Sequence, residues 1–80
     1  NAHVNNGRYI NWLIDTFPTS FHQQNRIKTM QLNYLAEVFP DQKLHIARQQ
    51  VANNFFLFEV TNSDKKPLFR AKLSFRTNTE

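Results

Sequence analysis

The sequence predicts an α+β fold, in which one long helix packs on a curved antiparallel sheet of about four strands. Two observations predict it. Apolar residues repeat with a helical period over residues 5–17, and the period changes to two from Ile27 onward. A third observation is the order of the segments, because one helix followed by strands in meander order is typical of a helix packed on one sheet.

The first element, residues 5–17, is predicted to be a single helix. Its apolar face is formed by residues at i, i+3, i+4 and i+7, namely Ile10, Leu13, Ile14 and Phe17. Asn5 or Asn6 can cap the start of the helix, and Pro18 ends it. The polar residues 18–26 are expected to form a loop or a short extra turn.

The remaining segments are predicted to be strands. Over residues 27–38, alternation places on one face Met30, Leu32, Tyr34, Ala36 and Val38. Further strands are expected from about 43 to 50 and from about 54 to 61, and residues 62–67 have the composition of a hairpin loop. The last strand is the clearest, because apolar Phe69, Ala71, Leu73 and Phe75 alternate with polar Arg70, Lys72, Ser74 and Arg76.

Composition limits the classes of function. Eighty residues suit one small domain, and the absence of cysteine excludes disulfides, a thiol nucleophile and cysteine zinc sites, which fits a reducing cytoplasm. Ten Lys and Arg against six Asp and Glu give a net charge of +4, which favours an acidic partner. No apolar run is long enough to span a bilayer.

His3 is the leading candidate for catalysis. Its intrinsic pKa lies near neutrality, so an imidazole there can deprotonate water or protonate a leaving group. Asn1 lies two residues earlier, so in an extended loop both side chains point to the same side, and the amide can hold a carbonyl or a water. The alternative is that His3 only bonds the start of the helix.

Glu37 is the second candidate, as a general base for water or as a partner that orients His3. The alternative is an ordinary exposed glutamate at a strand end. Substrate is expected to bind at the start of the helix, where backbone N–H groups are unpaired and suit an oxygen that gains negative charge. The residues predicted to bind it are Val4, Asn5, Asn6 and Gly7.

The other notable side chains favour structural interpretations. His22 and His45 are predicted to be structural or exposed, and the histidine spacing supports no metal site. Eight phenylalanines can line an acyl tunnel or an RNA-binding sheet, but the ordinary-core interpretation is favoured. The last strand supports it, since its rings and its cations alternate and so lie on opposite faces.

Two segments resemble the C-terminal hotdog unit of the acyl-acyl-carrier-protein thioesterases: N-A-H-V-N-N-G-R-Y-I-N-W-L-I-D-T-F-P at residues 1–18 and L-N-Y-L-A-E-V at residues 32–38. In that family an Asp-x-Asn-x-His loop and a glutamate on the next strand are catalytic. Asn1, His3 and Glu37 match three of these positions. The plant enzymes have a cysteine after the glutamate, where this chain has Val38.

The resemblance implies a hotdog fold and a cytoplasmic, bacterial enzyme of fatty acid biosynthesis. It would hydrolyse fatty acyl thioesters of the acidic acyl carrier protein by water attack, with no cofactor and no metal. The alternatives are a single-hotdog acyl-CoA thioesterase that works as a homo-oligomer and a non-catalytic module that binds acyl ligands. A nucleic-acid-binding module is a distant third, because it would require the cations to cluster on one exposed face.

Hotdog proteins place a strand before the helix, and they pair as tandem units or as oligomers. We therefore expect residues 1–80 to be one hotdog-like domain, a fragment that lacks this strand and a preceding hotdog unit. Because a small core without one strand buries too little apolar area, the isolated fragment is predicted not to fold stably. A thermal scan of the 80-residue peptide tests this, and a cooperative unfolding transition would contradict it.

Overall fold

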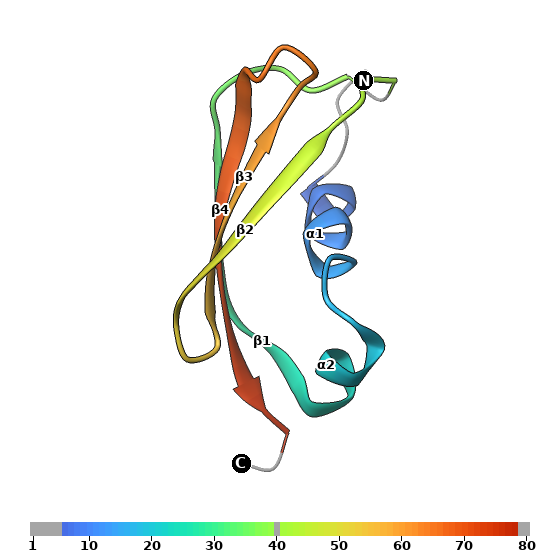
Figure 1. Ribbon diagram of the computed structural model, residues 1–80. Coiled ribbons are helices and arrows are strands. Elements are labelled where there is room, and N and C mark those ends of the chain that lie inside the picture. The colour runs from blue at the N-terminus through green and yellow to red at the C-terminus, as the bar shows by residue number, and fades with distance from the viewer. Residues whose placement is uncertain (1–5, 40, 79–80) are drawn as a thin grey trace.

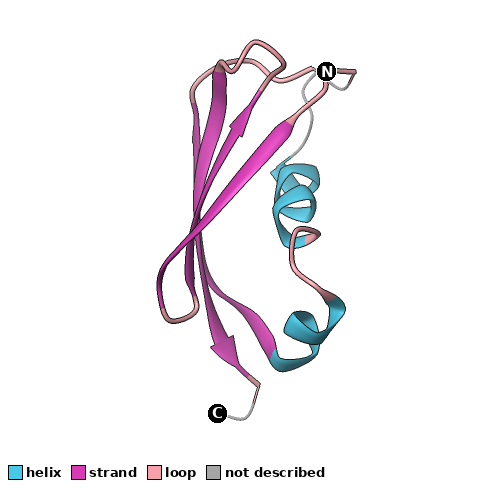
Figure 2. Cartoon of the chain, viewed as in Figure 1, coloured by secondary structure: helices cyan, strands magenta, loops and turns pink. Residues whose placement is uncertain are grey.

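The computed structural model describes residues 6–39 and 41–78, which form two helices and one four-stranded antiparallel sheet. In chain order the elements are α1 (Asn6–Ile14), α2 (Thr19–Gln24), β1 (Asn25–Tyr34), β2 (His45–Ala52), β3 (Phe55–Thr61) and β4 (Pro67–Thr77). Both helices lie on the same side of the curved sheet (Figures 1 and 2). The predicted α+β class and the antiparallel sheet are confirmed.

The helix is shorter than the predicted span of residues 5–17. The described helix α1 has nine residues and ends at Ile14. Beyond it the amides of Thr16 and Phe17 donate to carbonyls three residues earlier, at 3.2 and 3.1 Å, which tightens the chain into a turn. Pro18 then takes an extended conformation directly before α2. The polar stretch after Pro18 thus contains the short extra helical turn that was one of its two expected conformations.

The side of α1 that faces the sheet is formed by Tyr9, Leu13 and Phe17, the last in the turn after the helix, with exposed fractions of 6%, 0% and 6%. Leu13 and Phe17 belong to the predicted apolar face. Ile10 and Ile14, which were also predicted to face the core, are half-buried at its flanks. The buried stripe is therefore rotated slightly, so that Tyr9 takes the position nearest the start of the helix.

The strand order is β1-β4-β3-β2. The last three strands form the expected meander, but the predicted meander order is wrong for β1, which pairs with β4 and not with β2. The chain therefore crosses one end of the sheet between Tyr34 and His45 to reach the opposite edge (Figure 1). A central position suits β4, because its inward side chains are apolar throughout and bury most area between two neighbours.

Pairing between β1 and β4 fixes which side chains face the helices. Leu32 lies opposite Ala71 and Tyr34 opposite Phe69, so the face predicted from alternation is confirmed for these residues. Because β1 is an edge strand, its side chains on this face are incompletely covered. Met30 remains 52% exposed and Tyr34 43% exposed, although both lie on the helix side of the sheet.

Each of the two hairpins contains one residue with a positive φ, Asn54 in the first and Lys65 in the second. Asn54 has a φ of 59° in the turn between β2 and β3, a conformation that asparagine adopts more readily than most residues. In the loop before β4, the Asn62 side-chain oxygen accepts hydrogen bonds from the amides of Asp64 and Lys66 at 2.9 and 3.0 Å. The composition of residues 62–67 thus predicted the hairpin loop correctly.

Aromatic rings fill the core beyond the end of α1. The Phe17 ring lies 4.9 Å from that of Phe56 and 5.3 Å from that of Phe75, measured between centroids. Arg48, on the edge strand β2, covers this cluster, since its guanidinium carbon is 4.3 Å from the Phe17 centroid and it donates to the Thr16 carbonyl at 3.0 Å. The ordinary-core interpretation is confirmed for the five buried phenylalanines, Phe17, Phe56, Phe58, Phe69 and Phe75.

Leu13 offers a direct test of the helix–sheet contact. Leu13→Ala in the full-length protein is expected to lower the free energy of unfolding by about 2–5 kcal/mol, because it leaves a cavity under a fully buried side chain. Urea unfolding followed by circular dichroism measures this. Ile14→Ala is the control, since that side chain is half-buried and its loss should cost less. Equal effects of the two substitutions would contradict the packing described here.

Candidate functional site

The predicted site residues divide into two groups. Asn1, His3, Val4 and Asn5 lie outside the described residues. Asn6 begins α1, and Gly7 is exposed in its first turn. The start of this helix has backbone N–H groups without partners inside the helix, and a glycine there leaves room for a ligand to approach the backbone.

Glu37 lies beyond the strand on which it was predicted, because β1 ends at Tyr34. The amides of Leu35 and Ala36 both donate to the Leu68 carbonyl, at 2.8 and 3.1 Å. Because two consecutive residues share one acceptor, the hydrogen-bond ladder between β1 and β4 ends here. Glu37 is exposed, whereas the next residue, Val38, is 5% exposed and belongs to the core. The backbone on both sides of this carboxylate is therefore anchored.

The start of α1 and the end of β1 meet at the same end of the domain (Figure 1). The contact is made by two tyrosines, Tyr9 from the helix and Tyr34 from the strand, whose ring centroids are 5.4 Å apart. The Phe69 ring lies against both, at 5.0 Å from Tyr9 and 5.9 Å from Tyr34. The structure thus joins α1 to the end of β1 through these rings, at one end of the sheet.

The environment of this pair changes the chemistry of both phenols. Burial raises the pKa of Tyr9. Burial also raises the pKa of Tyr34, with a smaller contribution from the nearby Tyr9. Because a raised pKa favours the neutral form, both phenols keep their protons at and somewhat above neutral pH, where each can donate a hydrogen bond.

Sequence reasoning counted Tyr34 only as part of an apolar face. The signal that identifies it as a candidate polar group is its place in the alternation, at the last strand residue on the helix side and three residues before Glu37. Arg48 was missed for a similar reason. A cation in a strand is usually expected on the face of the sheet away from the core. Its pairing opposite Phe58 instead places Arg48 on the helix side, at the sheet edge.

The described histidines take no part in this arrangement. His22 lies in α2 and its Nε2 donates to the Ile14 carbonyl at 3.0 Å, so it bonds the C-terminal end of α1. His45 is exposed at the start of β2. Both agree with the structural or exposed positions predicted for them. Among residues 6–39 and 41–78, no three His, Asp or Glu side chains gather as metal ligands would.

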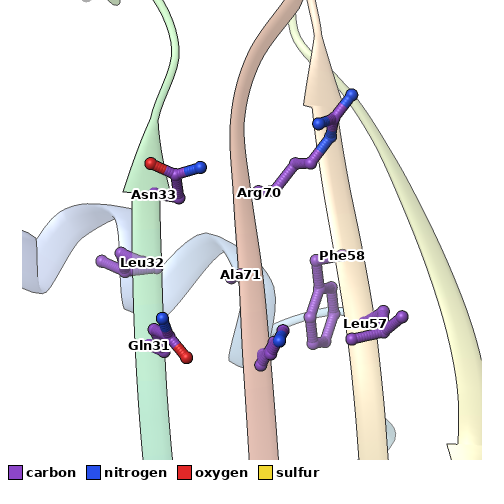
Figure 3. Close-up of a pocket in the computed structure, with 8 residues that line it drawn as sticks. Gln31, Leu32, Asn33, Leu57, Phe58, Arg70 and Ala71 are labelled. Atoms are coloured by element: carbon purple, nitrogen blue, oxygen red, sulfur yellow. The ribbon is translucent and has the colours of Figure 1, made fainter.

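A groove of about 340 Å³ lies on the face of the sheet away from the helices. Figure 3 shows the Gln31 and Asn33 amides and the Arg70 guanidinium on this face, with a helix behind the strands. Arg70 is engaged with Glu59, at 2.9 Å between Nε and Oε2, and both side chains are largely exposed. The groove has no acid–base pair beyond this solvated ion pair, so we do not assign chemistry to it.

Cations gather along β4 on the same outer face. Arg70, Lys72 and Arg76 are exposed there, and Arg26 lies opposite Arg76 on β1. The aromatic residues of β4 point to the other side and are buried, so the cations have no rings beside them on that strand for stacking bases. This arrangement suits a solvated or acid-binding surface better than a nucleic-acid platform. No helix within the described part of the chain is long and apolar enough to cross a membrane.

Comparisons with known proteins agree with this architecture. The profile of the family described as acyl-ACP thioesterase C-terminal domain matches residues 1–77. No curated protein matches the chain. Among solved structures, an acyl-ACP thioesterase from Bacteroides thetaiotaomicron VPI-5482 is 33% identical, with a TM-score of 0.84 over 95% of this chain and 31% of that one.

A second solved structure, the 12:0-ACP thioesterase from Umbellularia californica, is 26% identical, with a TM-score of 0.81 over 98% of this chain and 30% of that one. The chain thus spans about a third of the length of each of these two proteins. The curved, unclosed antiparallel sheet formed by the described residues of this chain matches these hotdog-fold thioesterases. The chain belongs to the acyl-ACP thioesterase C-terminal domain family.

Proposed function

We propose that this chain carries the catalytic residues of a thioester hydrolase that releases free fatty acid from acyl carrier protein. The observation that carries the proposal is that the family match over residues 1–77 includes Asn1, His3 and Glu37, the positions to which the sequence resemblance assigns catalysis. A module that only binds acyl ligands has no need of this set together.

In the proposed reaction a water oxygen attacks the thioester carbonyl carbon, and either His3 or Glu37 accepts a proton from that water. The carbonyl oxygen gains negative charge in the tetrahedral intermediate. The carbon–sulfur bond then breaks as the carbonyl re-forms, and the leaving thiolate takes up the proton. The products are a fatty acid and the free thiol of the carrier, and Asn1 positions the thioester or the water.

The described residues support three parts of this mechanism. The first N–H groups of α1 suit an oxygen that becomes negative, and Gly7 leaves the backbone accessible. Glu37 is exposed, so water can reach its carboxylate. A thiol nucleophile has no candidate, since the chain has no cysteine, and Val38 occupies the position after the glutamate. This supports attack by water rather than by a thiol.

The proposed partner is the acidic acyl carrier protein, which suits a chain with a net charge of +4. The name of the relative from Umbellularia californica, a 12:0-ACP thioesterase, also supports a carrier-bound substrate. We place the enzyme in the bacterial cytoplasm and in fatty acid biosynthesis, supported by the relative from Bacteroides thetaiotaomicron and by the absence of cysteine.

We also propose that these 80 residues are one hotdog unit at the C-terminal side of a longer chain, preceded by the strand before α1 and by another hotdog unit. The share of the solved structures that the chain covers, 31% and 30%, supports this organisation. Pairing with the preceding unit would cover Met30 and Tyr34, the large side chains that edge strand β1 leaves exposed on its helix side.

The test is release of free thiol from acyl carrier protein and from CoA thioesters by the full-length protein. His3→Ala and Glu37→Gln are each expected to lower carrier-protein turnover by about 100- to 10,000-fold, the usual contribution of a general acid or base. His45→Ala is the matched control, because that histidine is exposed at the start of β2 and lies outside the site.

The outcomes separate the alternatives. Turnover of carrier-protein thioesters that collapses in both variants and survives in His45→Ala supports the proposal. Activity on CoA thioesters alone would replace it with the single-hotdog acyl-CoA thioesterase. Absence of turnover on either substrate, with acyl ligands still bound, would leave a lipid-binding hotdog module whose Asn1, His3 and Glu37 have no catalytic use.

A further inference from the structure

The positive charge of this chain is concentrated in its sheet. The four strands contain a single carboxylate, Glu59, and six cations, namely Arg26, Lys28, Arg48, Arg70, Lys72 and Arg76. The positive balance of the strands thus exceeds the net charge of +4 of the whole chain, so the residues outside the strands are on balance slightly acidic.

Four of these cations form a stripe on the face of the sheet away from the helices. Along β4, exposed Arg70, Lys72 and Arg76 alternate with buried apolar residues, and exposed Arg26 lies opposite Arg76 on β1. Successive outward residues of a strand are about 7 Å apart, so the stripe is about 20 Å long. We call these four residues the outer cationic stripe.

The outer cationic stripe is poorly neutralised within the described part of the chain. Arg70 pairs with Glu59 through Nε, at 2.9 Å, which uses one of the five N–H donors of its guanidinium. Among residues 6–39 and 41–78, no ion pair engages Arg26, Lys72 or Arg76. Like charges directly opposite on paired strands are destabilising, as Arg26 and Arg76 are here. Carboxylates of a bound partner would remove this repulsion.

The groove beside the stripe offers contacts of other kinds. It has a volume of about 340 Å³ and is lined by the Gln31 and Asn33 amides from β1 and by Leu57 from β3 (Figure 3). Leu57 is half-buried and lies opposite Lys72. Amides can donate to carboxylates, and Leu57 provides an apolar contact between polar groups. This combination suits the surface of a folded acidic protein better than a simple anion.

One end of the stripe lies beside the proposed site. Arg70 is in register with Asn33, one residue before Tyr34, where β1 ends. Glu37 follows three residues later. The pairing proposed with a preceding unit covers the helix side of β1, which is the opposite face, so it leaves this surface open.

We infer that the outer cationic stripe is the docking surface for an acidic protein, which under the proposed function is the acyl carrier protein. The inference rests on the proposed function for the identity of this partner. It adds the face on which the partner binds. The carrier lies on the outer face of β1 and β4, and its thioester reaches the site around the end of the sheet where β1 finishes.

The test reverses two charges of the stripe in the full-length protein, with Lys72→Glu and Arg76→Glu combined. The probe is labelled acyl carrier protein that carries an acyl amide in place of the thioester, and fluorescence anisotropy measures its Kd. The double variant is expected to bind at least about 10-fold more weakly at low salt, and its Kd is expected to depend less on salt, because like charges now face the partner.

The matched control combines Lys65→Glu and Lys66→Glu. Both lysines are exposed in the loop between β3 and β4, and their reversal changes the net charge by the same amount. The control is expected to bind the carrier nearly as tightly as the wild-type protein. Circular dichroism of each variant checks that the fold is retained.

Kinetics give a second readout. Reversal of Lys72 and Arg76 is expected to raise KM for the carrier-bound thioester about 10-fold with little change in kcat, because docking precedes the chemical step. An uncharged acyl thioester of N-acetylcysteamine is the reference substrate for each variant, since it has no acidic surface that could dock.

The results distinguish this inference from the proposed function. If carrier binding and KM are unchanged by the reversal, or change equally in the control, the inference is wrong and the proposed function stands. If the wild-type protein hydrolyses nothing but binds the carrier through the stripe, the docking surface is established and hydrolysis is not. Binding of anionic phospholipid vesicles or of duplex RNA that the reversal abolishes, with carrier binding intact, would assign the stripe to another partner and overturn the inference.

Discussion

The contact between α1 and β4 is the constraint on which the rest of the structure depends. Tyr9 packs against Phe69 at 5.0 Å and Phe17 against Phe75 at 5.3 Å, so the helix and the turn after it lie along the central strand. Leu13, between these two contacts, is completely buried. Because both ends of the contact are fixed, the start of the helix can only lie at the end of the sheet where β4 begins and β1 finishes.

The two ends of this contact differ in how far their polar groups are hydrogen-bonded and how far their side chains are exposed. At the far end, Arg48 covers the Phe17 ring and donates to the Thr16 carbonyl just after α1. The last carbonyls of the helix, of Leu13 and Ile14, accept hydrogen bonds from the side chains of Thr16 and His22. Cations and donors near a helix C-terminus offset its partial negative charge, so that end is satisfied within the chain. At the near end, Tyr34 is 43% exposed and Glu37 is exposed.

The faces of the elements could be predicted from the sequence because alternation and helical spacing report burial directly. The apolar positions of β4 are buried as predicted, and Leu13 and Phe17 lie in the core. The position of β1 beside β4 could not be predicted, since alternation says which face a strand buries and nothing about its neighbours. The end of α1 at Ile14 was missed because its apolar spacing continues to Phe17, which is buried from a turn instead.

The candidate site was predictable only as far as residue types and spacing allow. The alternation in the sequence places Glu37 on a strand, but β1 ends earlier, where two amides share the Leu68 carbonyl. This arrangement involves backbone groups only, so no residue type in the sequence predicts it. The polar character of Tyr34 was overlooked, because a tyrosine is counted as apolar in an alternation pattern although its hydroxyl is polar.

The edge position of β1 explains why Tyr34 is held by its neighbours and yet partly exposed. On the central strand β4, the ring opposite it, Phe69, has no exposure at all, so a phenol there would be sealed from any ligand. In a loop, the same phenol would be accessible but not held in one orientation. An edge strand next to a buried helix gives an intermediate case, since the ladder to β4 and the Tyr9 ring hold a side chain that is still 43% exposed. The exposure of Tyr34 is therefore a consequence of its place on an edge strand, since only one side of β1 has a neighbouring strand among the described residues.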